Sequence, residues 1–313
     1  MSFSGDVKRE LAHIPPVCEN CKKALLYGLF LMNRISRANL TLMHTEHKPV
    51  ADCYINLLTE LTGAIVTMFI SDYTGPKKKQ SYTVGLENKE DIERLCLYFG
   101  INPENPVRRL DREYLKRDCC VHSFLRGVYM ACGSVTNPEK EYHLELAVGD
   151  TNLAEDIVLL AENCGISFRK TSRKGSIILY LKESEPIEDM LTLMGAVNST
   201  LELMNVKIYK DVRNKVNRVT NCETANIEKT INAAATQVEQ IRLIQTTVGL
   251  DNLPEDLKEV AILRLENPDM SLRELCMTLS EPISRSGVNH RLKRLAAIAE
   301  EIKCKRKQGV KDV

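Results

Sequence analysis

A short apolar segment with a glycine near each end, FLRGVYMACGSV at residues 124–135, constrains the fold of this chain more than any other feature. A similar segment, ALLYGLFLMNRI, spans residues 24–35, so Gly28 and Gly127 are 99 positions apart. Gly127 and Ala131 are four residues apart and share one face of a helix. Small residues on such a face allow a second backbone to come close. We therefore expect the two segments to form helices that pack against each other.

The elements expected after these two segments follow the same order in both halves. Each half reads as helix, strand, helix, two strands joined by a hairpin, and helix. Glycines that end expected helices pair as Gly63 with Gly165 and Gly100 with Gly195, at offsets of 102 and 95. Such a repeat predicts an internal duplication, folded as an α+β saddle whose halves join through the glycine-bearing helices. Two unrelated α+β units with coincidental glycines are the alternative.

The pattern divides the chain into six segments and predicts an α+β saddle followed by an all-α domain. Ser4 is expected to cap the first helix, and Asn152, with Glu155 three residues later, a helix of the second repeat. The expected segments are an N-terminal helix at 1–17, repeat 1 at 18–102, a connector at 103–120, repeat 2 at 121–196, a basic linker at 197–221 and a helical C-terminal domain at 222–313.

The clearest local signal in the C-terminal domain lies at about residues 271–303. Ser271 and Glu274 form a capping-box pattern before a short helix, and Ser284 is expected to cap a second helix after the turn SEPI. Two helices joined by such a turn are typical of a helix-turn-helix. The residues expected to be buried on the second helix are Val288, Leu292, Leu295 and Ile298, and those on the preceding long helix are Ile227, Ile231, Ala234, Val238 and Ile241.

The start of the second helix has side chains suited to DNA. Those expected on its exposed face are Arg285, Ser286, Asn289, His290, Lys293 and Arg294. Asn and Arg can form bidentate contacts with adenine and guanine edges in the major groove, and the last two residues are expected to contact phosphates. Residues 284–307 contain eight Lys or Arg against two Glu, although the whole chain has a net charge of +1. We expect double-stranded DNA as the partner; a helical bundle with ordinary solvated charge is the alternative.

Basic residues also gather at the expected hairpin tip of each repeat. They are Lys77, Lys78 and Lys79 in the first repeat, and Arg169, Lys170, Arg173 and Lys174 in the second. Hairpin tips of this charge are suited to lie along phosphates. The alternatives are a solvated charged face or a saddle that presents a surface to a protein partner.

Four of the eleven cysteines form two close pairs, Cys18 with Cys21 and Cys119 with Cys120. Four sulfurs are enough for one zinc ion. Against zinc, CENC leads directly into an apolar helix and CC is not the spacing of a zinc knuckle. We therefore expect no metal and no cofactor. Zinc analysis of protein purified without chelator would test whether the cysteines bind zinc.

The longest apolar runs are far shorter than the ~18 residues of a spanning helix, and the N-terminus lacks the apolar core of a signal peptide. We expect reduced thiols, a cytoplasmic, nucleoid-associated protein, no membrane partner and no small-molecule substrate.

FLRGVYMACGSV resembles the signature helix of LAGLIDADG homing endonucleases, and the duplicated order of elements is similar to their fold. Over essentially the whole chain, and most specifically in NKVNRVTNCETANIEKT and SGVNHRLKRL, the sequence resembles the bacterial WhiA family. This resemblance implies an endonuclease-like domain joined to a helix-turn-helix. It also implies a role in sporulation control, cell division or chromosome segregation.

The resemblance also allows the nuclease chemistry to be tested. LAGLIDADG nucleases place an acid near the foot of each signature helix, where the pair holds catalytic metal ions. The matching positions here are Asn33 and Cys132, and neither supplies a hard anionic oxygen for magnesium. No acid occurs within residues 30–38 or 129–138. We expect a non-enzymatic regulator of transcription; the alternatives are a nucleoid-associated division protein that does not regulate promoters and an active endonuclease.

Overall fold

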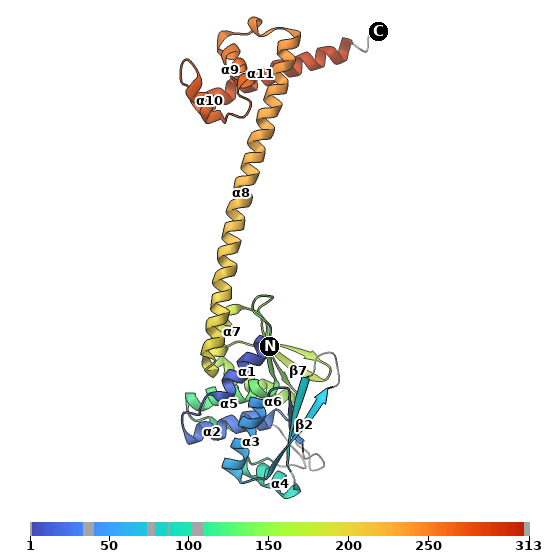
Figure 1. Ribbon diagram of the computed structural model, residues 1–313, viewed down its shortest axis with the longest axis vertical. Coiled ribbons are helices and arrows are strands. Elements are labelled where there is room, and N and C mark those ends of the chain that lie inside the picture. Colours follow the sequence, from blue (N-terminus) through green and yellow to red (C-terminus); the bar gives the residue numbers. More distant parts are fainter. Residues whose placement is uncertain (1, 34–40, 74–78, 87, 102–108, 310–313) are drawn as a thin grey trace. The chain divides into compact units, whose positions relative to one another are not determined.

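The structure is a computed structural model that describes residues 2–33, 41–73, 79–86, 88–101 and 109–309. The chain forms two compact units, Met1–Asp211 and Val212–Val313, each with its own apolar core. The first unit contains both sheets and the second is helical, which confirms the predicted fold class. The boundary between the units falls inside helix α8 (Val197–Thr247) (Figure 1).

The first repeat of the N-terminal unit follows a short helix, α1 (Phe3–His13). Its elements are α2 (Glu19–Leu31), β1 (Thr41–Thr45), α3 (Lys48–Thr62), β2 (Val66–Tyr73), β3 (Lys79–Leu86) and α4 (Lys89–Tyr98). The strands form an antiparallel sheet in the order β1-β3-β2. The apolar residues Tyr82, Val84 and Leu86 alternate along β3 and are buried in the core, and their neighbours Ser81 and Gly85 are buried as well.

The second repeat follows a short 3-10 helix, η1 (Arg112–Leu115), and has the same order of elements with one additional strand, β4. Its elements are α5 (Asp118–Cys132), β4 (Gly133–Val135), β5 (Leu144–Val148), α6 (Thr151–Glu162), β6 (Arg169–Arg173), β7 (Ser176–Leu181) and α7 (Ser184–Met194). The strands form an antiparallel sheet in the order β4-β5-β7-β6. The three-residue strand β4 was not predicted, because it is too short to show an alternating pattern.

Two of the predicted helix caps were wrong because each helix begins earlier than expected. Ser2, not Ser4, caps α1 by accepting a hydrogen bond from the Gly5 amide. Ser4 Oγ instead accepts from the Val135 amide at 3.3 Å, a contact between segments far apart in the sequence. Asp150, not Asn152, caps α6.

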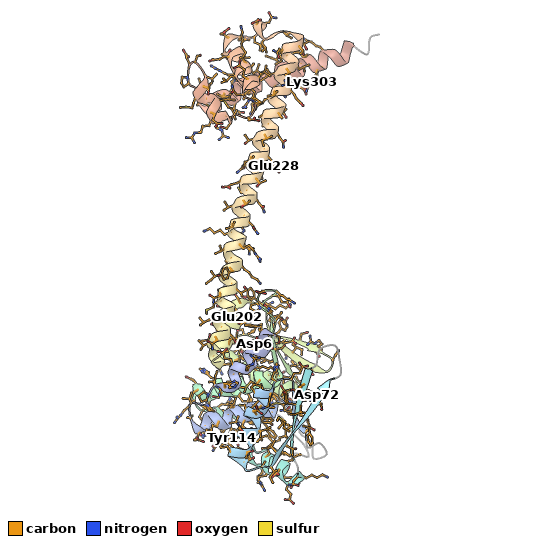
Figure 2. The ribbon with its side chains drawn as sticks, viewed as in Figure 1. Asp6, Asp72, Tyr114, Glu202, Glu228 and Lys303 are labelled. Atoms are coloured by element: carbon orange, nitrogen blue, oxygen red, sulfur yellow. The ribbon has the colours of Figure 1, made fainter. Side chains whose placement is uncertain are left out.

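Helix α8 passes through residues 197–221, which we had expected to be a linker. No glycine or proline interrupts residues 197–247, so nothing local breaks the helix before Gly249, which adopts a positive φ of 84°. Side chains such as Glu228 are exposed along it (Figure 2). Ile227 and Ile231, predicted to be buried, are also more than half exposed.

The C-terminal unit packs four helices around a second core. After η2 (Leu250–Asn252) come α9 (Glu255–Glu266), α10 (Leu272–Thr278) and α11 (Arg285–Gly309), which pack with the last turns of α8. Ile241 and Ile244 of α8 are buried among residues of all three helices. Within the described ranges, no helix is both long and apolar enough to cross a membrane.

Candidate nucleic-acid interface

The start of α10 is fixed by a reciprocal pair of hydrogen bonds. Ser271 Oγ accepts from the Glu274 amide at 3.3 Å, and Glu274 Oε2 accepts from the Ser271 amide at 2.7 Å. The bond from the Ser271 amide lowers the pKa of Glu274, because it stabilises the carboxylate. The capping box predicted from the sequence is therefore confirmed.

The turn between α10 and α11 is attached to α9. Glu259 Oε1 on α9 accepts a hydrogen bond from the Ser280 amide at 2.6 Å, and this bond lowers the pKa of Glu259. Ser284 Oγ accepts from the Gly287 amide at 3.2 Å, which confirms the predicted cap of α11. These contacts fix the orientation of the first turns of α11.

One face of α11 is buried in the core of the C-terminal unit. Its buried residues recur at four- and three-residue steps, at Val288, Leu292, Leu295, Ala299 and Ile302. Ile298, predicted to belong to this face, is only half-buried, because the register continues through its neighbour Ala299. The burial leaves the opposite face of α11 open over its first three turns.

Five of the six predicted recognition residues are exposed without an ion pair in the described part of the chain. They are Arg285, Ser286, Asn289, His290 and Lys293. Arg294 differs, because its Nη1 lies 3.1 Å from Oδ2 of Asp256 on α9. Arg294, which we expected to contact a phosphate, is therefore already paired with an acid of the same unit.

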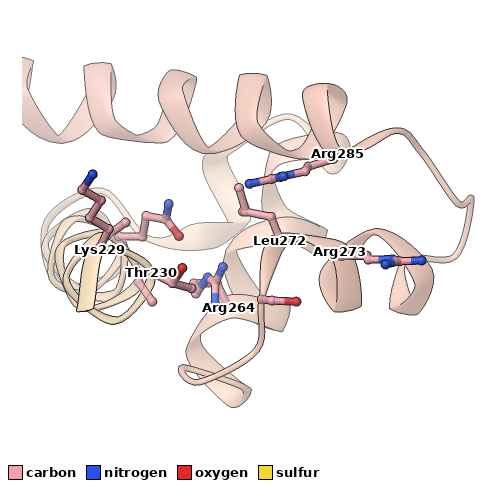
Figure 3. A pocket seen from close by; sticks show the side chains of 10 residues that line it. Lys229, Thr230, Arg264, Leu272, Arg273 and Arg285 are labelled. Atoms are coloured by element: carbon pink, nitrogen blue, oxygen red, sulfur yellow. The ribbon is translucent and has the colours of Figure 1, made fainter. Parts of the chain in front are cut away.

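Arg285 also lines a basic pocket of about 380 Å³ whose lining residues come from α8, α9, α10 and α11 (Figure 3). Three further basic side chains from different elements line the pocket, Lys229, Arg264 and Arg273, and no acid is among its lining residues. The buried Arg264 donates from Nη1 to the Met270 carbonyl at 2.6 Å, and its Nε has no hydrogen-bond partner in the structure. Burial lowers the pKa of Arg264.

Sequence reasoning missed the three other basic residues of this pocket. They come from α8, α9 and α10, so no spacing along the chain relates them to one another. Asn289 and Lys293 line a neighbouring groove of about 370 Å³, opposite amide and hydroxyl side chains of α8. The first turns of α11 therefore lie beside one cationic and one polar hollow.

The basic hairpins are built differently from this prediction. Lys77 and Lys78 lie outside the described residues, and the side chain of Lys79 in β3 is not described. In the second repeat, Lys174 and Gly175 form the two-residue turn, both with positive φ. Only Arg173 lies next to this turn; Arg169 and Lys170 are at the far end of β6, because the turn is shorter than expected.

Three basic residues of β6 face acids of the same unit. Arg169 lies 3.3 Å from Glu183, Lys170 lies 3.7 Å from Glu155, and Arg173 lies 3.1 Å from Glu145. Lys174 has no ion pair among the described residues. A phosphate would therefore have to compete with a carboxylate for three of the four basic side chains of this hairpin.

The glycine-bearing helices α2 and α5 lie side by side (Figure 1). A Cβ atom on Gly28 would lie 2.3 Å from the Phe124 carbonyl oxygen, and one on Gly127 would lie 2.4 Å from the Leu25 carbonyl oxygen. The two backbones are thus in direct contact, and the half-buried Ala131 packs against the same core.

The feet of these two helices hold no pair of carboxylates at the nuclease positions. Asn33 Nδ2 donates to the Leu29 carbonyl at 2.7 Å, and Cys132 Sγ donates to the Val128 carbonyl at 3.3 Å. Burial raises the pKa of Cys132 to about 12, which keeps the thiol neutral. Lys8 lies close enough to interact with Cys132, and burial lowers the pKa of Lys8. An amide, a neutral thiol and an amine do not form a magnesium site.

Two models of known protein families match parts of this chain. The WhiA LAGLIDADG-like domain matches residues 121–213, and the WhiA C-terminal HTH domain matches residues 216–299. The crystal structure of full-length DUF199/WhiA from Thermatoga maritima is similar, with a TM-score of 0.57 and 26% identity, over 96% of this chain and 99% of that one.

Two curated relatives are each named "Probable cell division protein WhiA". The protein from Carboxydothermus hydrogenoformans is 39% identical over 308 residues, and that from Oceanobacillus iheyensis is 41% identical over 311 residues. Each alignment covers 97% of this chain and 98% of the relative. With this similarity along nearly its whole length, the chain belongs to the WhiA family.

Proposed function

We propose that this protein is a sequence-specific DNA-binding regulator without nuclease activity. The observation that carries the proposal is the exposed start of α11, whose polar and basic side chains are mostly free of acids and border a pocket lined by four cations. Such a surface attracts an anionic polymer, since among the described residues only Arg291 and Arg294 of this helix start are paired with a carboxylate, that of Asp256. The capped and anchored turn holds the helix that presents it.

Reading of bases falls to the first two turns of α11. Arg285 suits a guanine edge and Asn289 an adenine edge, while Ser286 and His290 add single hydrogen bonds. Each bidentate contact is worth about 1–3 kcal/mol of discrimination between bases. Because the buried face of α11 is apolar, these side chains are the ones available to a major groove.

Phosphate contacts fall to Lys293 and to the basic pocket. Lys229 and Arg273 come from α8 and α10, so a DNA backbone that passes the pocket would meet cations from separate elements. Arg294 contributes less, because Asp256 already neutralises it. Contacts of this kind set register and salt dependence rather than sequence preference.

The duplicated saddle is proposed to keep the nuclease architecture without its chemistry. Two-metal hydrolysis of a phosphodiester needs hard anionic ligands between the two helices. The side chains of Asn33 and Cys132 instead donate hydrogen bonds to backbone carbonyls of their own helices. We infer that the saddle presents a surface to a protein partner, since the described cations of β6 are mostly paired with acids.

The proposed biological setting is supported by the relatives, each of which is named "Probable cell division protein WhiA". We propose that this chain acts at the nucleoid in cell division, chromosome segregation or sporulation-type development. A second candidate has the same support from these names: a nucleoid protein that acts in division without regulating promoters. Both functions use the same α11 surface.

Two experiments test these proposals. Genome-wide binding combined with transcript profiling after deletion separates the two candidates: sharp promoter peaks whose genes change support the regulator, and broad occupancy without transcript change supports the second candidate. Purified protein incubated with plasmid and magnesium or manganese should leave the plasmid intact. Cleavage that is abolished by a change at Asn33 or Cys132 would overturn the non-enzymatic proposal.

A further inference from the structure

Four cysteine sulfurs meet where the two glycine-bearing helices begin. Cys18 is the N-cap of α2 and Cys21 lies in its first turn, while Cys119 and Cys120 lie in the first turn of α5. All four Sγ atoms lie within 4.8 Å of one another, and those of Cys18 and Cys21 are 3.4 Å apart. From the sequence we expected no metal, because CENC leads directly into an apolar helix and CC is not the spacing of a zinc knuckle. The contact of α2 with α5 combines the two pairs in space.

We propose that these four cysteines bind one structural Zn²⁺ ion. With Zn–S bonds of about 2.3 Å, the sulfurs of a tetrahedral site lie about 3.8 Å apart. All four Sγ atoms already lie within 4.8 Å of one another, so small side-chain movements would bring them to this separation. A cluster with several iron atoms would separate its thiolates further, because they bind different irons, so a single ion fits best.

The ends of the two helices supply a suitable electrostatic environment for thiolates. Neither α2 nor α5 has a side-chain cap, so their first amide groups and helix dipoles are available to stabilise negative sulfur. Arg126 of α5 is buried, and its Nε and Nη2 have no hydrogen-bond partner among the described residues. It interacts electrostatically with Cys53 and, less strongly, with Cys21 of the cluster. A four-thiolate zinc centre has a net charge of −2, which this guanidinium would partly compensate.

The position of the cluster indicates a structural role. Cys21 and Cys120 are buried, whereas Cys18 and Cys119 are half-buried and leave a path for the ion to enter. Four protein ligands fill a tetrahedral site and leave no position for a substrate. Each repeat contributes one pair, so the ion would tie the beginnings of the two helices together, while their feet lie at the opposite helix ends.

Metal content of the untagged full-length chain, purified without chelator under reducing conditions, tests this directly. We expect about one zinc ion per chain, lost on chelation together with a lower thermal stability of the sheet-containing unit. Co²⁺ added to the stripped chain should give thiolate-to-metal charge-transfer and tetrahedral d–d absorption. Cys21→Ser and Cys120→Ser should weaken binding by more than about tenfold, the lower bound seen even for outer-shell changes.

Cys222→Ser and Cys304→Ser are the matched controls, because both thiols are exposed in the C-terminal unit. They should leave metal content and the Co²⁺ spectrum unchanged. If a ligand variant does not fold, the Co²⁺ titration of the unsubstituted chain decides. Three outcomes would overturn the proposal: folded, reduced chain that binds no metal, a Cys18–Cys21 disulfide in place of the ion, or equal loss of metal in the controls.

Discussion

The hairpin strand β6 and the start of α11 are both exposed and basic, yet their charges are used differently. Arg169, Lys170 and Arg173 of β6 each lie within 3.7 Å of a carboxylate. Arg285 and Lys293 of α11 have no such partner among the described residues. A phosphate that reaches β6 must therefore displace an acid, whereas one that reaches α11 need not. The pairing of charges, and not their number, distinguishes the two surfaces as DNA-binding candidates.

The largest expected effect is on the folding stability of the N-terminal unit, which contains the saddle and not the α11 surface. Gly127→Ala should destabilise the N-terminal unit by about 4 kcal/mol or more, because the new Cβ would lie 2.4 Å from the Leu25 carbonyl oxygen. Urea denaturation followed by circular dichroism measures the change. Gly149→Ala is the matched control, since a Cβ there meets nothing within 4 Å. Equal stability of the two variants would show that the helices do not need this contact.

Loss of a base-reading side chain should have the next largest effect. Asn289→Ala and Arg285→Ala should each weaken binding to a selected DNA site by about 1–3 kcal/mol and relax the preference for one base pair. Fluorescence anisotropy with matched and mismatched duplexes measures both changes. Arg112→Ala, an exposed arginine of η1, is the control and should change neither. If the control weakens binding as much as the α11 variants, α11 is not the reading helix.

Loss of the α10 capping box should have a smaller effect, on the stability of the C-terminal unit. Ser271→Ala removes the acceptor for the Glu274 amide and should cost about 1 kcal/mol. Ser286→Ala is the comparison, because that exposed serine has no described hydrogen bond. Thermal denaturation of the two variants should separate them; an unchanged midpoint for Ser271→Ala would mean that the box does not support α10.

The smallest expected effect is on the hairpin. Arg169→Ala combined with Arg173→Ala removes two surface ion pairs, each worth about 0–1 kcal/mol. Folding stability and DNA affinity should therefore both stay close to those of the unsubstituted chain. Affinity that falls as far as in the Asn289→Ala variant would place DNA on the sheet as well as on α11.

Local chemistry made much of this fold predictable from the sequence. The glycine spacing showed the duplication, because helix ends and a backbone contact both require glycine at set positions. The capping box at Ser271 and the cap at Ser284 located the two helices of the helix-turn-helix, since each depends on neighbours three residues apart. Most features set by residues close in sequence were therefore recovered, although the caps predicted at Ser4 and Asn152 were wrong because each helix begins earlier.

Features that depend on distant residues could not be predicted. The acids that neutralise β6 and the Asp256 that holds Arg294 come from other elements. The basic pocket also combines side chains from four helices. The predicted linker at residues 197–221 is part of helix α8. Its polar, basic composition is typical of a linker, but it contains no residue that breaks a helix.

The dependence of DNA affinity on salt tests the central claim most directly. The slope of log affinity against log salt should be measured for the unsubstituted chain, for Lys293→Ala, and for Arg169→Ala with Arg173→Ala. The α11 variant should flatten the slope by roughly one unit for each lost phosphate contact, and the β6 variant should leave it unchanged. A flattened slope for the β6 variant with no change for the α11 variant would contradict the account.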